Sequence, residues 1–160
     1  MFGTLDAKII EDLLRNQLIG RLGINGNPWP YVVPVSYAYD GEYVYGFTQE
    51  GTKVDLLRQR PEVCFEVEDT QDISNWKTVI AWGRFEELQE TALREHAIDM
   101  LNKRVLPMLN SETMRLSPFW PFVNKEDTHA LPGVVYRIKL EEKTGRYEKS
   151  ATPSRSYPAV

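Results

Sequence analysis

The segment Thr48 to Lys53 places a glycine, a hydroxyl and an amine where a predicted strand gives way to a predicted helix. The first N–H groups of a helix have no partner within it, and the helix dipole favours an anion there. Thr52 and Lys53 would add a hydroxyl and a cation, which suits a phosphate. The same spacing also fits an ordinary capped helix with a solvated lysine. The segment is neither a Gly-x-x-x-x-Gly-Lys loop nor a Gly-x-Gly-x-x-Gly motif.

The other reactive side chains are scattered along the sequence. His96 and His129 have no cysteine or carboxylate partners at the spacing of a zinc site, so no metal site is predicted. Glu86-Glu87 and Glu141-Glu142 lie on predicted strands, where neighbours point to opposite faces and cannot act as one acid–base couple. Cys64 lies in an apolar run and is expected to be a buried thiol. The sequence identifies no catalytic acid, base or nucleophile.

The composition suits one globular domain. The chain has 160 residues, of which 42% are hydrophobic and 26% charged, as in ordinary soluble domains. Its formal charge of -4 gives no attraction to nucleic acid or anionic lipid, so neither partner is expected. Neither a signal-peptide pattern nor an apolar run of about 18 residues occurs. We expect a cytoplasmic protein with one domain over residues 1–150 and a flexible tail over residues 151–160.

The spacing of apolar residues predicts the short helices and strands that carry the candidate residues. Apolar residues at helical spacing predict three helices, namely Thr4 to Asn16 with Thr4 as the cap, Thr52 to Gln59 before Pro61, and Thr91 to Leu101. Six strands are predicted, with a polar loop from Asp69 to Asn75 between the fourth and fifth: Ile19 to Ile24, Tyr31 to Ala38, Tyr43 to Thr48, Val63 to Val67, Lys77 to Leu88 and Val134 to Leu140. Without regular βαβ alternation, this order favours a mainly β (α+β) antiparallel barrel with peripheral helices.

Several blocks of the sequence resemble one known family in order and spacing. Tyr31 to Tyr37, Gly51 to Lys53 with Leu56-Leu57, and Pro61 to Val67 are similar to the pyridoxamine 5'-phosphate oxidase-like FMN-binding split-barrel family, in its flavin-nucleotide-binding and nitroimidazole-resistance-like branch. Further similar blocks extend the resemblance over most of Leu13 to Lys149: Asn75 to Leu88, Tyr136 to Ile138 and Gly145 to Glu148. The resemblance implies a six-stranded antiparallel split β-barrel.

The resemblance also implies a cofactor and its binding residues. FMN would lie between the subunits of a homodimer, with its ring along the predicted strand that begins at Tyr31 and runs to Ser36, and its phosphate on Thr52 and Lys53. Trp76, or the aromatic loop Phe119 to Phe122, would cover the flavin from the second subunit. The remaining cofactor-binding residues implied are the main chain of Val33, Pro34, Val35 and Ser36, the strand end Phe47 and Thr48, and the polar side chain Thr78.

Two departures from the family pattern bear on activity. Tyr31 and Ser36 stand where true pyridoxamine phosphate oxidases have an arginine and a lysine, and the tail Ser154 to Val160 does not resemble their basic C-terminal segment, so vitamin B6 oxidation is not expected. Gly46-Phe47 stands where nitroimidazole-resistance relatives often carry a histidine, which argues against that specialised activity.

The function predicted from these observations is that of an FMN-dependent oxidoreductase or flavin reductase with a small-molecule electron donor and acceptor. The cofactor would supply the redox chemistry and the protein its position. A non-catalytic flavin-binding or carrier module is an alternative. A haem-binding relative is a second alternative. Haem needs a well-placed axial ligand, and the scarcity of histidine, with two in the whole chain, argues against this alternative.

Overall fold

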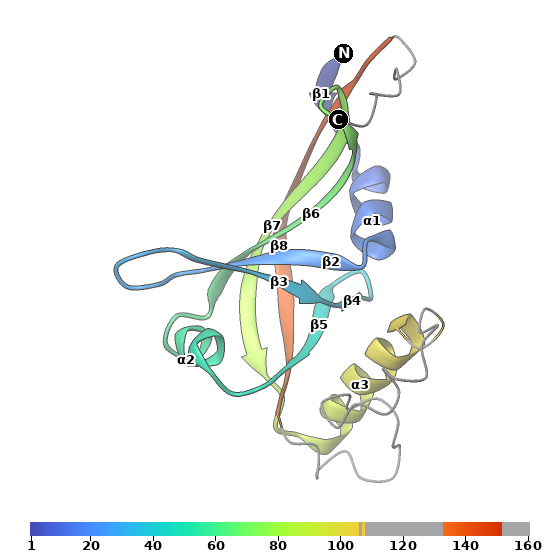
Figure 1. Cartoon of the computed structure of the whole chain (residues 1–160). Coiled ribbons are helices and arrows are strands. Elements are labelled where there is room, and N and C mark those ends of the chain that lie inside the picture. The colour runs from blue at the N-terminus through green and yellow to red at the C-terminus, as the bar shows by residue number, and fades with distance from the viewer. Residues whose placement is uncertain (106, 108–132, 152–160) are drawn as a thin grey trace, which may run out of the picture.

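The computed structural model describes residues 1–105, 107 and 133–151 (Figure 1). Within these ranges it has three α-helices and eight β-strands. The helices are α1 (Ala7–Asn16), α2 (Thr52–Gln59) and α3 (Thr91–Val105). The strands are β1 (Phe2–Thr4), β2 (Ile19–Ile24), β3 (Tyr31–Ser36), β4 (Ala38–Tyr39), β5 (Tyr43–Thr48), β6 (Glu62–Asp72), β7 (Asn75–Glu87) and β8 (Val134–Lys149).

The strands form one antiparallel sheet that curls on itself. Its order is β3-β2-β6-β7-β8-β5-β4, and β1 pairs with the far end of β8. β3 and β4 lie at opposite ends of this order, yet only Tyr37 separates them in the chain. The sheet must therefore curl until its two ends approach each other, with a break between them. This arrangement confirms the predicted mainly β split barrel.

The strand count differs from the six predicted. β1 has three residues, too few to show periodicity. The strand expected from Tyr31 to Ala38 is broken at Tyr37, whose side chain is buried and whose hydroxyl donates to the Leu14 carbonyl oxygen at 2.6 Å. That hydrogen bond ties the break in the barrel to α1.

The β6–β7 hairpin is longer than predicted. The polar stretch Asp69 to Asn75 was expected to be a loop, but β6 runs to Asp72 and β7 begins at Asn75. The Asp72 carboxylate accepts hydrogen bonds from the Ser74 N–H at 2.8 Å and the Asn75 amide at 2.9 Å, which closes the turn. Polar residues are tolerated here because the exposed end of the hairpin pairs them across the strands.

Three further boundaries also differ from the prediction. The predicted cap Thr4 lies in β1, and Asp6 caps α1 by accepting from the Ile9 N–H at 2.9 Å. α3 continues past Leu101 to Val105. β8 continues past Leu140, because its second half pairs with the extended start of β7.

The core has two parts. The larger lies inside the curled sheet, where alternate residues of β2, β6, β7 and β8 meet the apolar face of α1; it includes Leu14, Leu22, Phe65, Val79 and Ile138. The smaller lies under α3 and includes Tyr45, Ala97, Leu101 and Val135. No helix in the described part of the chain is both long and apolar enough to cross a membrane.

Candidate functional site

The N-terminus of α2 is open to a ligand. α2 follows β5 after a three-residue connection, and its N-cap residue, Gly51, makes no side-chain capping hydrogen bond. A Cβ placed on Gly51 would meet no atom of the described residues within 4 Å. α1, by contrast, is capped by Asp6. Among the described residues, no side chain therefore caps the first N–H groups of α2, and an anion could take that place.

Lys53 adds an uncompensated positive charge to this helix end. Its side chain is half-buried, and it has no hydrogen-bond or ion-pair partner among the described residues. Burial alone lowers the pKa of its amine. A cation removed from water without a partner costs free energy, which an anionic ligand beside it would recover. Lys53 and the start of α2, with Thr52 exposed beside them, are therefore a candidate site for a phosphate-like group.

β3 offers an unpaired backbone edge beside the same part of the core. It lies at one end of the sheet and pairs with β2 alone in the described part of the chain. The Val35 side chain is buried in the core cluster that also holds Leu57 of α2, so one core supports both elements. Val35 could thus meet a ligand only through its main chain. Val33 is half-buried, whereas Pro34 and Ser36 are exposed.

Phe47 and Thr48 end β5 and lead directly into α2. Both are half-buried and pair with Val135 and Val134 of β8. The Thr48 hydroxyl donates to the Gln49 carbonyl oxygen at 3.4 Å. Because only three residues separate Thr48 from Thr52, the chain itself holds this strand end close to the anion site.

Trp76 and Thr78 lie elsewhere. They pair with Thr70 and Glu68 in the second half of β6, whereas α2 leads into β6 at Glu62. At about 3.3 Å per strand residue, Glu68 lies about 20 Å along β6 from that point. The Thr78 hydroxyl already donates to Glu66 Oε1 at 3.1 Å. Strand register thus places these two residues far from the point where α2 leads into β6, and their role beside the flavin stays a prediction.

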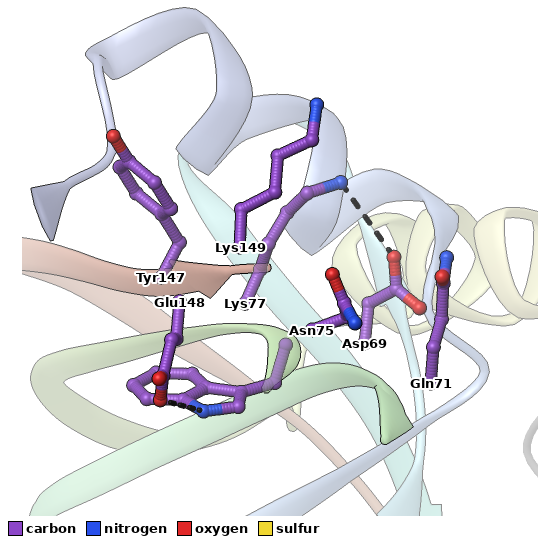
Figure 2. A pocket seen from close by; sticks show the side chains of 8 residues that line it. Asp69, Gln71, Asn75, Lys77, Tyr147, Glu148 and Lys149 are labelled. Atoms are coloured by element: carbon purple, nitrogen blue, oxygen red, sulfur yellow. Dashed lines mark hydrogen bonds and ion pairs between the residues drawn. The ribbon is translucent and has the colours of Figure 1, made fainter. Parts of the chain in front are cut away.

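A hollow of about 220 Å³ lies at the end of the β6–β7–β8 sheet (Figure 2). Its charged groups are partly paired with each other: Lys77 Nζ is 3.7 Å from Asp69 Oδ2, and Trp76 Nε1 donates to Glu148 Oε2 at 3.3 Å. Sequence reasoning missed this hollow, because part of it was predicted to be a loop. Its lining residues are Asp69, Gln71, Asn75, Trp76, Lys77, Tyr147, Glu148 and Lys149.

A second hollow, of about 320 Å³, lies on the outer face of the sheet, with Gly23, Pro30, Cys64 and Trp82 in its lining. Cys64 is half-buried rather than fully buried as predicted, because strand alternation turns Val63 and Phe65 into the core instead. Burial raises the pKa of the Cys64 thiol. In the described part of the chain, burial and the nearby Glu66 both raise this pKa, and no cation there activates the thiol.

The histidines form no site in the described part of the chain. His96 is exposed, and its ring packs edge-on against Tyr45 with centroids 5.5 Å apart. No group of three or more histidine, cysteine, aspartate or glutamate side chains that could hold a metal occurs in residues 1–105, 107 and 133–151. His129, the aromatic loop Phe119 to Phe122 and residues 152–160 of the predicted tail lie outside the described residues.

Comparison with known proteins shows the family. Residues 6–147 match the family described as pyridoxamine 5'-phosphate oxidase, and the chain belongs to that family. It is 30% identical over 132 residues to an uncharacterised protein of Rhizobium meliloti (strain 1021), a match that covers 80% of this chain and 83% of that protein.

Two solved structures show the same fold. The crystal structure of a FAD-binding protein from Mesorhizobium loti matches with a TM-score of 0.70 and 28% identity, covering 93% of this chain and 99% of the other. The FAD and haem binding protein from Mycobacterium smegmatis matches with a TM-score of 0.68 and 13% identity, covering 97% of this chain and 76% of the other. At that identity the second likeness concerns the fold alone.

Proposed function

We propose that the chain binds FMN, with the phosphate at the N-terminus of α2 and the isoalloxazine ring along β3. Lys53, the Thr52 hydroxyl and the first N–H groups of α2 would hold the phosphate. The main chain of residues 33–36 would contact the ring, and Phe47 and Thr48 would flank the ribityl chain. The observation that carries the proposal is the half-buried Lys53 amine, which has no partner among the described residues.

FMN is proposed rather than FAD because the charges at the start of α2 match one terminal phosphate. One uncompensated lysine and one helix N-terminus match a single phosphate group, and the arginine of the same helix, Arg58, is paired with Glu50 and Glu87. The Mesorhizobium loti relative is named for FAD, so the two flavins need a direct comparison. Mass spectrometry of cofactor released by heat from the purified protein distinguishes them, and we expect the mass of FMN.

The bound flavin would make the protein an oxidoreductase with a small-molecule electron donor and acceptor. Flavins supply redox chemistry themselves, and the chain would supply position and exclusion of water. We expect reduced nicotinamide to bleach the bound flavin in the absence of oxygen, and quinones, nitro compounds or oxygen to restore its absorbance. If no donor reduces the bound flavin, the protein is a carrier or storage module instead.

Pyridoxamine phosphate is not the proposed substrate. Its phosphate would need a second set of cationic side chains, and Tyr31 and Ser36 stand where the oxidases have an arginine and a lysine. Incubation with pyridoxamine phosphate and oxygen should therefore give no rapid formation of pyridoxal phosphate. Rapid formation would overturn this part of the proposal.

The active unit is proposed to be a homodimer in the cytoplasm. A second copy would bring Trp76 and Thr78 to a flavin that the first copy holds at Lys53. The outer sheet face carries an apolar row across four strands, from Val32 (63% exposed) through Gly23 and Cys64 to Trp82 (42% exposed). Such a row suits contact with another subunit. Light scattering should give about twice the monomer mass of 18.5 kDa, and Trp82→Glu should reduce it.

A further inference from the structure

Arg58, in the last turn of α2, joins the connection before the helix to the end of β7. Its guanidinium donates to both carboxylate oxygens of Glu50 at 2.8 and 2.9 Å. It also donates to both oxygens of Glu87, at 2.7 and 2.8 Å. The two bidentate contacts use four of the five N–H donors of the planar guanidinium. These hydrogen bonds hold the pKa of the Glu87 carboxyl below its usual value.

Glu50 is the residue immediately before the N-cap Gly51. A carboxylate at this position can itself accept hydrogen bonds from the free N–H groups of a helix start, and it is attracted by the positive end of the dipole. It would also be drawn to the unpartnered Lys53 amine. Glu50 is therefore a competitor for the same donors that the proposed phosphate site uses.

The structure directs this carboxylate elsewhere. Arg58 lies six residues after Thr52, which places its backbone about 9 Å along the helix axis from the first turn. Both Glu50 carboxylate oxygens accept from Arg58, and no side-chain cap from the described residues occupies the start of α2. The first turn keeps its donors for another anion.

We propose that Arg58 is a positioning residue that keeps the phosphate site open by holding the Glu50 carboxylate away from the N-terminus of α2. The inference rests on the proposed function, because it assumes that a flavin phosphate occupies this site. Arg58 would thus help to determine the preference for phosphorylated flavin without contacting the ligand.

A purely structural role for Arg58 makes a different prediction. If Arg58 only fastened the connection through Glu50, then Glu50→Gln and Arg58→Gln would break the same link and harm binding alike. If Arg58 instead restrains a competing carboxylate, Glu50→Gln is harmless and also repairs Arg58→Gln. The two variants and their combination therefore separate the two roles.

The experiment titrates flavin-free full-length protein with FMN and, separately, with riboflavin, following flavin fluorescence. We expect Arg58→Gln to weaken FMN up to about five-fold, the scale of exposed charge effects, and to leave riboflavin unchanged. Glu50→Gln should change FMN affinity by less than about two-fold, and the double variant should return close to the parent. Glu87→Gln, which removes the other partner of Arg58, is the matched control and should not affect FMN.

The outcomes of this titration that would overturn the proposed role of Arg58 can be distinguished from those that would overturn flavin binding itself. Equal loss of FMN affinity in Arg58→Gln, Glu50→Gln and the double variant would overturn the inference in favour of simple fastening, as would no loss in Arg58→Gln. In both cases a parent that still prefers FMN to riboflavin leaves the proposed function intact. A parent that binds neither flavin overturns the proposed function and this inference together.

Discussion

Replacing Lys53 with methionine is expected to weaken FMN binding and to stabilise the flavin-free protein. Methionine keeps an apolar stem of similar length and removes the ammonium group. Burial lowers the pKa of Lys53, so the folded chain binds this proton less tightly than the unfolded chain. The cost of burying the cation is then fully present below the folded pKa and disappears as the pH rises from the folded pKa to the unfolded one. Lys53→Met removes this cost.

The loss of affinity follows from the contact that disappears. A hydrogen bond to a charged group contributes about 1.5 to 3 kcal/mol. At about 1.4 kcal/mol per factor of ten, FMN affinity should fall by about 10- to 150-fold. Riboflavin has no phosphate, so its affinity should stay within about two-fold of the parent. Fluorescence titration measures both affinities, and thermal unfolding of the flavin-free variant measures stability.

The matched control is Lys8→Met, which removes an exposed lysine on α1. It should leave both flavin affinities and the unfolding temperature close to those of the parent. The reasoning is refuted if Lys53→Met weakens FMN and riboflavin equally, or if it matches Lys8→Met in every measurement.

Two further predictions concern stability. A Cβ on Gly46 would lie 2.2 Å from Cζ of the buried Tyr136 ring, so Gly46→Ala should cost about 1 to 3 kcal/mol in urea unfolding; an unchanged midpoint would contradict this packing. Burial raises the pKa of Asp40, but hydrogen bonds from the Tyr43 N–H and the Tyr45 hydroxyl, both 2.7 Å, outweigh it and the pKa is lowered. This stabilisation is present above about pH 4 and is lost as the pH falls through the folded pKa. Asp40→Asn should therefore be less stable than the parent at pH 7, and this difference in unfolding free energy should narrow below pH 4. A difference that does not change with pH would contradict this role of Asp40.

The elements around the candidate site could be predicted because local signals mark their ends. The glycine at Gly51 and the proline at Pro61 bracket α2, and the structure gives its predicted bounds, Thr52–Gln59. β2 and β5 also have their predicted bounds. Such strands alternate between core and surface or end at turn residues, and both signals are readable locally.

The elements that were missed depend on contacts between distant residues. The end of the β6–β7 hairpin is polar, and it is a strand because Asp69 faces Lys77 and Glu68 faces Thr78 across the ladder. The break at Tyr37 depends on a carbonyl 23 residues away in α1. Periodicity within a short window contains neither fact.

In the candidate site, too, some features could be predicted from local sequence and others depend on contacts between distant residues. The sequence places Lys53 at a helix start, but only the fold shows that its amine is half-buried and lacks an acidic partner in the described residues. The link from Arg58 to Glu87 spans 29 residues and has no sequence signature. The placement of Trp76 and Thr78 in the half of β7 that pairs with the end of β6 likewise follows from strand register.

The most direct test of flavin binding is the absorption spectrum of the purified full-length protein, followed by mass analysis of the released cofactor and by FMN titration. The account predicts a flavin spectrum, or its appearance when FMN is added, and a released mass equal to that of FMN. The absence of flavin absorbance together with no FMN binding in the titration would contradict it.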